Sequence, residues 1–251
     1  MTTRQMKTIK NFRDCGGYAT ADGRRMRAGR VYRSGTLDDA RDSDLDALQS
    51  IGFKTIVDLR APREKKKELP LIAGARRIDL PIDLENKARD RLPPLMTKRG
   101  AEGEVVEVLK QMYRDLADET WPQAGQLFQI LLSADVYPLL IHCRAGKDRT
   151  GFLCALVQQA VGLERASIFQ DYLKTNDHFG LVTPRMERVM KIFSLGRLRM
   201  DNVRASFSAR QEYLQAAFDQ IDQRHGGLAA YLAKCGMTSS EIETLRRWLV
   251  E

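Results

Sequence analysis

The chain has 251 residues, of which 43% are hydrophobic and 29% are charged, and this composition excludes a disordered or collagen-like protein. It contains no run of 18 apolar residues, and its first twelve residues lack an apolar signal core, so neither a membrane-spanning helix nor a secretory signal is expected. The net charge of +8 favours anionic partners, although no nucleic-acid-binding module is recognisable.

Strand-like and helix-like segments alternate along the chain. Short β-branched and apolar runs predict strands at residues 30–33, 53–59, 77–80 and 136–141, the first of them at the edge of a sheet. Apolar periodicity predicts helices over residues 44–51, 104–116, 120–132, 149–161, 164–174, 185–204, 209–224 and 241–250. The alternation implies one α/β domain over residues 1–251, with a mainly parallel central sheet flanked by helices and a helical C-terminal part from 180 to 251.

Several helices carry signals for their ends or their surroundings. Ser43 and Thr120 are expected to cap the helices that follow them, and Ser240 with Glu243 predicts a capping box. The helix over 149–161 is apolar on nearly every side, which is typical of a buried central helix. The basic segment 185–204 is expected to face the core with its apolar side, and an anionic membrane surface is the alternative.

Residues 84–103 show no clean periodicity and contain Pro93 and Pro94 as well as two glycines. They fall between the third predicted strand and the next helix. A lid or recognition insert is one interpretation of such a segment, and a disordered surface loop is the other.

The segment from His142 to Thr150 carries the clearest chemistry. A cysteine is followed by five residues and then by Arg149 and a hydroxyl, between a predicted strand and a predicted helix. A loop of this kind turns its backbone N–H groups inward at a helix N-terminus, where the helix dipole also favours anions. The expected phosphate-binding residues are Arg144, Ala145, Gly146, Lys147, Asp148 and Arg149.

Each residue type in this loop has a chemical role. The N–H groups and Arg149 are expected to favour the thiolate of Cys143. The expected reaction is attack of this thiolate on phosphorus, which gives a phosphocysteine that water then hydrolyses. The planar guanidinium of Arg149 can hold two phosphate oxygens, and Gly146 provides a position without a Cβ. Thr150 is expected to donate a hydrogen bond to the sulfur. No metal or other cofactor is required.

The loop resembles the signature of the cysteine-dependent protein tyrosine phosphatase superfamily. Its full form, HCRAGKDRTG, is similar to a bacterial and fungal branch, several of whose members also accept phosphoinositides. Further motifs resemble that branch at residues 11–18 (NFRDCGGY), 31–35 (VYRSG), 56–60 (IVDLR) with Glu64, and 171–176 (DYLKTN). The resemblance covers about residues 11 to 176 and implies a cysteine-phosphatase-like fold, with supporting residues His142, Thr150, Arg13 and Asp14.

The general acid is less clear than the nucleophile. Many tyrosine phosphatases carry it in a Trp-Pro-Asp loop, but here Gln123 stands at the third position and cannot donate a proton. The resemblance favours Asp148, and a salt bridge that orients a neighbouring cation is the alternative role for this residue. Asp79 and Asp83 are alternative acids, and Asp14 is expected to brace the loop.

We expect a phosphotyrosine-directed phosphatase with phosphotyrosine proteins or peptides as partners. Lys147 is expected on the loop rim, where it would extend activity to phosphoinositides, while shaping of the loop is its alternative role. Phosphoserine and phosphothreonine are further candidate substrates. The competing hypothesis is a phosphate-binding module without turnover.

Four cysteines without C-x2-C spacing and three histidines predict neither a disulfide framework nor a zinc site. Cys154 is expected to be a packed small residue, whereas Cys15 is a candidate redox partner of Cys143. A reactive thiol suits a reducing cytoplasm, and export without a signal peptide remains open.

Overall fold

The computed structural model describes residues 6–65, 70–83, 87–179 and 184–251. In this part of the chain a sheet of five strands has the order β1-β2-β5-β3-β4. Only β1 runs antiparallel to its neighbour, so the prediction of a mainly parallel sheet is confirmed. The strands are β1 (Arg13–Asp14), β2 (Val31–Ser34), β3 (Thr55–Asp58), β4 (Arg76–Asp79) and β5 (Leu139–His142).

The strand predicted for the edge of the sheet lies inside it. β2 pairs with β5 along its whole length, and the short β1 covers its other side, so β2 is an inner strand. The sequence pattern did not separate β1 from the loops. Ser34, His142 and Asp58 are in register at the carboxyl ends of β2, β5 and β3. In a parallel sheet this edge is where loops from several strands meet, and ligands commonly bind there.

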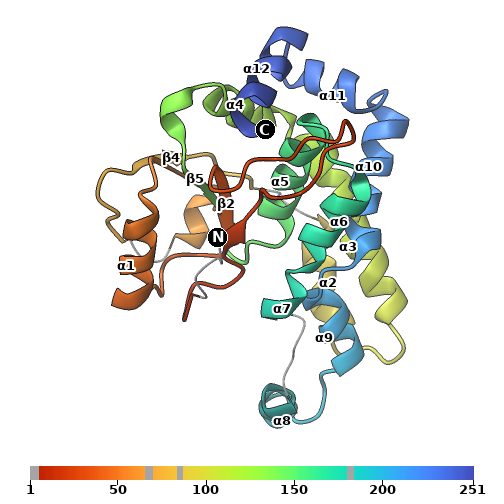
Figure 1. Cartoon of the computed structure of the whole chain (residues 1–251). Coiled ribbons are helices and arrows are strands. Elements are labelled where there is room, and N and C mark those ends of the chain that lie inside the picture. The colour runs from red at the N-terminus through yellow and green to blue at the C-terminus, as the bar shows by residue number, and fades with distance from the viewer. Residues whose placement is uncertain (1–5, 66–69, 84–86, 180–183) are drawn as a thin grey trace.

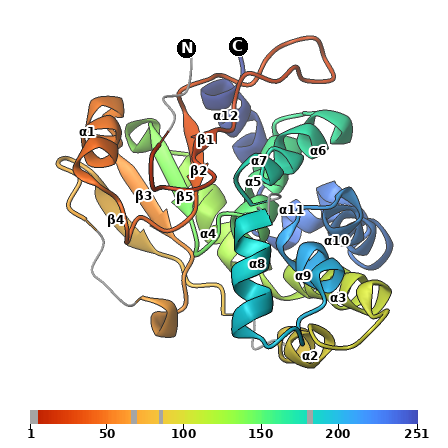
Figure 2. The ribbon, with the colours of Figure 1, turned by 90° about the horizontal axis from the view of Figure 1, so that it is seen from below.

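The helices cover the two faces of the sheet unequally (Figures 1 and 2). The first helix, α1 (Asp42–Ile51), packs on one face, where Leu48, Ile56 and Leu140 share a small core. On the other face Val57 and Ile141 join the large core around α5 (Asp148–Ala160). Successive strand residues therefore point to opposite cores, as the period of a strand requires. The side chains of α5 are nearly all buried, which confirms the prediction of a central helix.

The remaining helices lie mainly on the α5 side. They are α2 (Lys87–Leu95), α3 (Glu102–Glu119), α4 (Trp121–Leu131), α6 (Arg165–Leu173), α7 (Asn176–Phe179), α8 (Pro184–Phe193), α9 (Met200–Phe207), α10 (Gln211–Arg224), α11 (Leu228–Lys234) and α12 (Ser239–Leu249). Two short 3₁₀ helices cover Pro62–Glu64 and Ala134–Val136. Part of the segment 84–103 thus forms α2, which lies against α3.

Three helix ends differ from the prediction. The residue before α1 is Arg41, and Ser43 lies inside the helix. The capping box of α12 is formed by Thr238 and Glu241 instead of Ser240 and Glu243. Thr120 precedes α4 as expected, but its hydroxyl donates to the Leu116 carbonyl (2.6 Å) and accepts no hydrogen bond from the first N–H groups of α4.

The predicted helix 185–204 is divided into α8 and α9. Leu195 and Gly196 adopt positive φ angles of 51° and 73°, which reverse the chain between the two helices. The prediction that this segment is one core-facing helix is therefore wrong. No helix among the described residues is long and apolar enough to cross a bilayer.

Candidate active site

The loop after β5 has the predicted strand–loop–helix form. Cys143 follows the last strand residue directly and is buried. Its Sγ accepts a hydrogen bond from the backbone N–H of Gly146 at 3.2 Å, and α5 begins two residues later at Asp148. The thiol therefore faces an inward backbone N–H group close to a helix N-terminus, an arrangement that suits a bound anion.

Gly146 is fixed by the neighbouring strand. Its φ of 67° is left-handed, and a Cβ at this position would meet the backbone of Ser34 and lie 2.6 Å from the Gly35 nitrogen. Its carbonyl accepts hydrogen bonds from Asn11 Nδ2 (2.6 Å) and Arg33 Nη2 (2.7 Å). Two of the N-terminal motifs therefore hold the loop in place through one carbonyl group.

A buried ion pair network ties these motifs to α6. Arg13 Nε donates to Asp171 Oδ1 at 2.9 Å, and Arg33 Nη1 donates to Asp171 Oδ2 at 3.0 Å. Burial alone would raise the pKa of Asp171, but the two arginines outweigh it and hold this pKa below its ordinary value. Arg13 therefore lies in the network that braces the loop, which is compatible with the supporting role expected of it.

Asp14 does not contact the loop, contrary to the prediction. Its carboxylate accepts hydrogen bonds from the backbone N–H groups of Gly16 (2.8 Å) and Gly29. Burial raises its pKa despite these bonds. Asp14 therefore stabilises the turn after β1 and the turn before β2.

Arg149 lies against the carboxylate of Glu64. Nη2 of Arg149 donates to Glu64 Oε1 at 2.8 Å, and Nη1 donates to the other oxygen of the same carboxylate. Burial lowers the pKa of Arg149, but the hydrogen bond to Glu64 and the neighbouring negative charges together outweigh it and leave the pKa above its ordinary value. Glu64 occupies the Nη1–Nη2 edge of the guanidinium, so the edge formed by Nε and the second Nη2 hydrogen faces no carboxylate of the described residues.

His142 is buried at the end of β5 beside a second ion pair. Burial lowers its pKa to about 4 despite Asp58, whose Oδ1 lies 3.8 Å from Nε2. Asp58 pairs chiefly with Arg60, at 3.0 Å from Nη2. His142 is therefore neutral near pH 7, and neither ring nitrogen has a hydrogen-bond partner within the described part of the chain.

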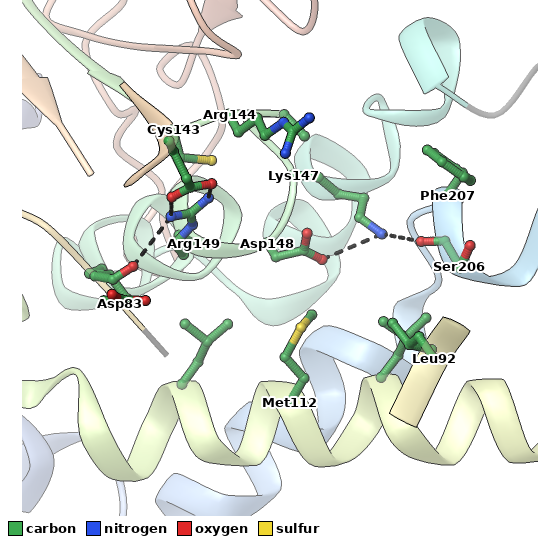
Figure 3. Close-up of a pocket in the computed structure, with 15 residues that line it drawn as sticks. Asp83, Leu92, Met112, Cys143, Arg144, Lys147, Asp148, Arg149, Ser206 and Phe207 are labelled. Atoms are coloured by element: carbon green, nitrogen blue, oxygen red, sulfur yellow. Dashed lines mark hydrogen bonds and ion pairs between the residues drawn. The ribbon is translucent and has the colours of Figure 1, made fainter. Parts of the chain in front are cut away.

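A cavity of about 230 Å³ opens over Cys143 (Figure 3). Its floor is formed by the loop from Cys143 to Arg149, with Glu64 and Asp83 at one side. Its apolar wall comes from four separate segments and consists of Ile82, Leu92, Leu109, Met112, Leu116 and Phe207. A pocket with an anion-binding floor and an apolar wall fits a phosphate ester that carries an apolar or aromatic group.

The structure distinguishes among the candidate acids. Asp148 lines the cavity, and its Oδ1 accepts a hydrogen bond from Tyr113 OH at 2.9 Å. Asp83 also lines the cavity but pairs with Arg63. Asp79 does not line it: its side chain is 69% exposed and pairs with Lys65 at 2.7 Å. Asp148 and Asp83 remain as candidates, and Asp79 is placed away from the thiol.

Two loop residues differ from their expected positions. Lys147 is buried rather than on the rim, and its Nζ donates to the carbonyls of Ser206 (2.9 Å) and Ser208 (3.3 Å). Its ammonium also lies 3.4 Å from Asp148 Oδ1, so the structure agrees with the loop-shaping role. The Thr150 hydroxyl, which was expected to donate to the sulfur, is buried without a partner among the described residues.

Cys15 was considered a partner of Cys143, but the structure brings it to Cys154. The two buried thiols of Cys15 and Cys154 are hydrogen-bonded to each other, and this bond together with burial raises the pKa of Cys15 well above its ordinary value. Cys154 is a packed residue of α5, as expected. The position of Cys15 gives no support to a disulfide with the loop cysteine.

The sequence did not predict the roles of three residues in the site, Glu64, Tyr113 and Phe207. Glu64 was identified only as part of a motif, and Tyr113 looks in the sequence like one more residue on the buried face of α3. Burial and the charge of Asp148 raise the pKa of Tyr113 well above its ordinary value, so its hydroxyl remains a donor. Phe207 reaches the cavity from α9, and no sequence signal links it to the loop.

The chain is similar to known proteins over nearly its whole length. Residues 4–251 match the model of the family described as "Tyrosine phosphatase family". The chain is 29% identical over 277 residues to the triple specificity protein phosphatase PtpB of Mycobacterium tuberculosis, with 98% of each protein covered. It is 27% identical to a tyrosine-protein phosphatase of Nostoc commune, over 85% of this chain and 72% of that protein. It is also 31% identical to the inositol diphosphatase DSP4 of Arabidopsis thaliana, over 43% of this chain and 51% of that protein.

Proposed function

The chain belongs to the tyrosine phosphatase family, and on this premise we propose that it hydrolyses phosphotyrosine through a phosphocysteine intermediate on Cys143, without a metal. The observation that carries the proposal is the position of the Cys143 thiol. It lies at the floor of the cavity, with the Gly146 N–H directed at its sulfur and Arg149 beside it. This combination supports both anion binding and nucleophilic attack.

Arg149 would hold the phosphoryl group through the edge that Glu64 leaves open. The carboxylate fixes the guanidinium in one orientation, so little side-chain freedom is lost when the phosphate binds. A planar guanidinium that donates two parallel hydrogen bonds suits the equatorial oxygens of a phosphoryl group in the transition state of its transfer.

The reaction would proceed in two displacements. Cys143 Sγ forms a bond to phosphorus while the bond to the ester oxygen breaks, and Asp148 gives its proton to that oxygen. A water molecule then attacks the phosphocysteine, its proton passes to the Asp148 carboxylate, and the sulfur leaves as thiolate. The hydrogen bond from Tyr113 holds Asp148 over the cavity at both steps.

The apolar wall favours an aromatic leaving group. Met112, Leu109 and Phe207 line the cavity and offer an apolar surface to the ring of a phosphotyrosine. The names of two relatives, a triple specificity phosphatase and an inositol diphosphatase, make phosphoinositides a second substrate class to test, together with phosphoserine and phosphothreonine. Arg144 is exposed and lines the same cavity, so it is one available cation for a second phosphate.

The test is hydrolysis of p-nitrophenyl phosphate and a phosphotyrosine peptide in excess EDTA. We expect turnover that survives chelation, is lost in Cys143→Ser, and gives a burst of p-nitrophenol when acid-quenched early. Cys143→Ala should retain binding of the phosphopeptide, because Arg149 and the backbone N–H groups remain. If the wild type binds the peptide but shows no turnover, the chain is a phosphate-binding module and the proposed reaction is wrong.

A further inference from the structure

An exposed apolar surface lies on α8 and the turn that follows it. Val189, Ile192 and Phe193 are spaced along one side of the helix, and Ile192 and Phe193 are 71% and 86% exposed. Leu195, in the turn, is 82% exposed. Large apolar side chains gathered in this way on a surface usually mark a binding region. We refer to these four residues as the α8 surface.

The α8 surface projects from the body of the molecule. Figure 1 shows α8 standing clear of the other helices, and Figure 2 shows it in the foreground when the molecule is seen from below. The chain that follows is anchored, because Arg199 N donates to the Met96 carbonyl (2.8 Å) and Asn202 Nδ2 donates to the Leu95 carbonyl (2.6 Å). Whatever binds the α8 surface is therefore held next to α2 and α9.

Basic residues accompany this apolar surface. Residues 184–207 contain six lysines and arginines but only two acidic residues. Arg188 and Arg197, on either side of the exposed apolar side chains, are themselves exposed. A short amphipathic helix with exposed large apolar residues and flanking arginines has the features of a segment that lies in the interface of an anionic bilayer.

We propose that the α8 surface docks the enzyme onto an anionic lipid bilayer, with Ile192, Phe193 and Leu195 inserted at the level of the headgroups. This inference concerns binding and does not depend on the proposed reaction. A second copy of the chain is a poorer occupant. In a two-fold dimer the same patch faces itself, so the arginines of one copy would lie against the basic patch of the other, whereas acidic lipid headgroups neutralise them.

The docking surface is connected to the candidate active site. The C-terminal residues of α9, Ser206 and Phe207, line the cavity over Cys143, and Phe207 is 50% exposed. The eight residues of α9 span about 12 Å. Docking through α8 would therefore bring the cavity wall close to the lipid headgroups, where phosphorylated lipids or membrane-bound phosphoproteins are found.

The experiment is co-sedimentation of the full chain with vesicles of phosphatidylcholine alone or mixed with phosphatidylserine. We expect binding to the mixed vesicles only, weakened by salt. Ile192→Asp with Phe193→Asp should reduce the partition coefficient about tenfold or more, since each side chain loses apolar burial and gains a charge that the headgroups repel. Leu71→Asp is the matched control, because Leu71 is equally exposed (86%) but distant in sequence, and it should bind like the wild type.

A second pair of variants separates local charge from net charge. The double variant Arg188→Glu with Arg197→Glu should weaken binding. Its control, Arg25→Glu with Arg247→Glu, changes the net charge by the same amount at two exposed arginines elsewhere, and it should weaken binding less. Circular dichroism confirms folding of every variant. The proposal is overturned if vesicles with and without phosphatidylserine bind alike, or if Leu71→Asp loses as much binding as the α8 variant. It is also overturned if, without vesicles, the wild type is a dimer that the Ile192 and Phe193 changes disperse.

Discussion

Arg33 and Asp171 form a buried ion pair at 3.0 Å although they are 138 positions apart in the chain. The same guanidinium donates to the carbonyl of Gly146, so the pair connects β2, α6 and the phosphate loop.

Asp171→Asn should destabilise the protein by about 3–5 kcal/mol, because it leaves two buried arginines without their carboxylate. The free energy of unfolding in urea at pH 7 measures this. Asp222→Asn, which breaks the exposed pair with Arg165, is the control and should cost at most about 1 kcal/mol. Similar losses in the two variants would contradict a bracing role for Asp171.

Asp148→Asn should slow the hydrolysis of phosphoserine far more than that of p-nitrophenyl phosphate, whose leaving group needs little protonation. The loss on the poor leaving group is expected to be about 10²–10⁴-fold in kcat. Asp79→Asn should leave both rates unchanged because this side chain lies outside the cavity. Equal losses on both substrates would indicate a structural role for Asp148 and direct attention to Asp83.

Lys147→Met should lower the turnover of phosphotyrosine and phosphoinositide substrates by the same factor, because its buried ammonium holds Ser206 and Ser208 rather than a ligand. The stability loss should be about 1.5–3 kcal/mol, as for other hydrogen bonds to charged groups. Arg144→Met, at an exposed position, should change stability by no more than about 0.5 kcal/mol. If Lys147→Met selectively removed phosphoinositide turnover, the ammonium would have to face the substrate after all.

His142 should make stability depend on pH in a defined window. Its folded pKa of about 4 lies below that of an unfolded histidine, so the unfolded state binds the proton first. Stability from this residue is therefore complete above about pH 6.5 and falls as the pH drops toward 4, by roughly 3 kcal/mol in total. Urea unfolding at several pH values should show a shallower decline for His142→Gln than for the wild type. Parallel curves would mean that other groups carry the pH dependence.

The order of strands and helices in the core could be predicted from the sequence because it follows from local periodicity. The strand that ends at His142 and the apolar helix after Arg149 each lie within a few residues of their expected positions. The two-residue β1 was not predicted as a separate strand because it forms only by pairing with β2. Without β1, β2 was assigned to the edge of the sheet. The break at Leu195 and Gly196 is also local, and Gly196 is a signal for it that the apolar periodicity over 185–204 outweighed in the prediction.

The residues of the candidate site likewise divide into those that the local sequence predicts and those that depend on distant contacts. The positions of Cys143, Gly146 and Asp148 follow from one continuous motif, whose spacing is visible in the chain. The direction of the Lys147 side chain depends on carbonyls about 60 residues away. Residues such as Tyr113 enter the site only because α3 packs beside α5, and composition and spacing contain no trace of that contact.

The close approach of Gly146 to the end of β2 has a consequence for protein engineering. A library that varies the phosphate loop at this position would fail at nearly every member, since the first carbon of any side chain collides with the backbone at Ser34 and Gly35. Altering only the loop therefore cannot open this position. A redesign that seeks a wider loop has to rebuild the carboxyl end of β2 in the same step, and the two segments should be varied as a single unit.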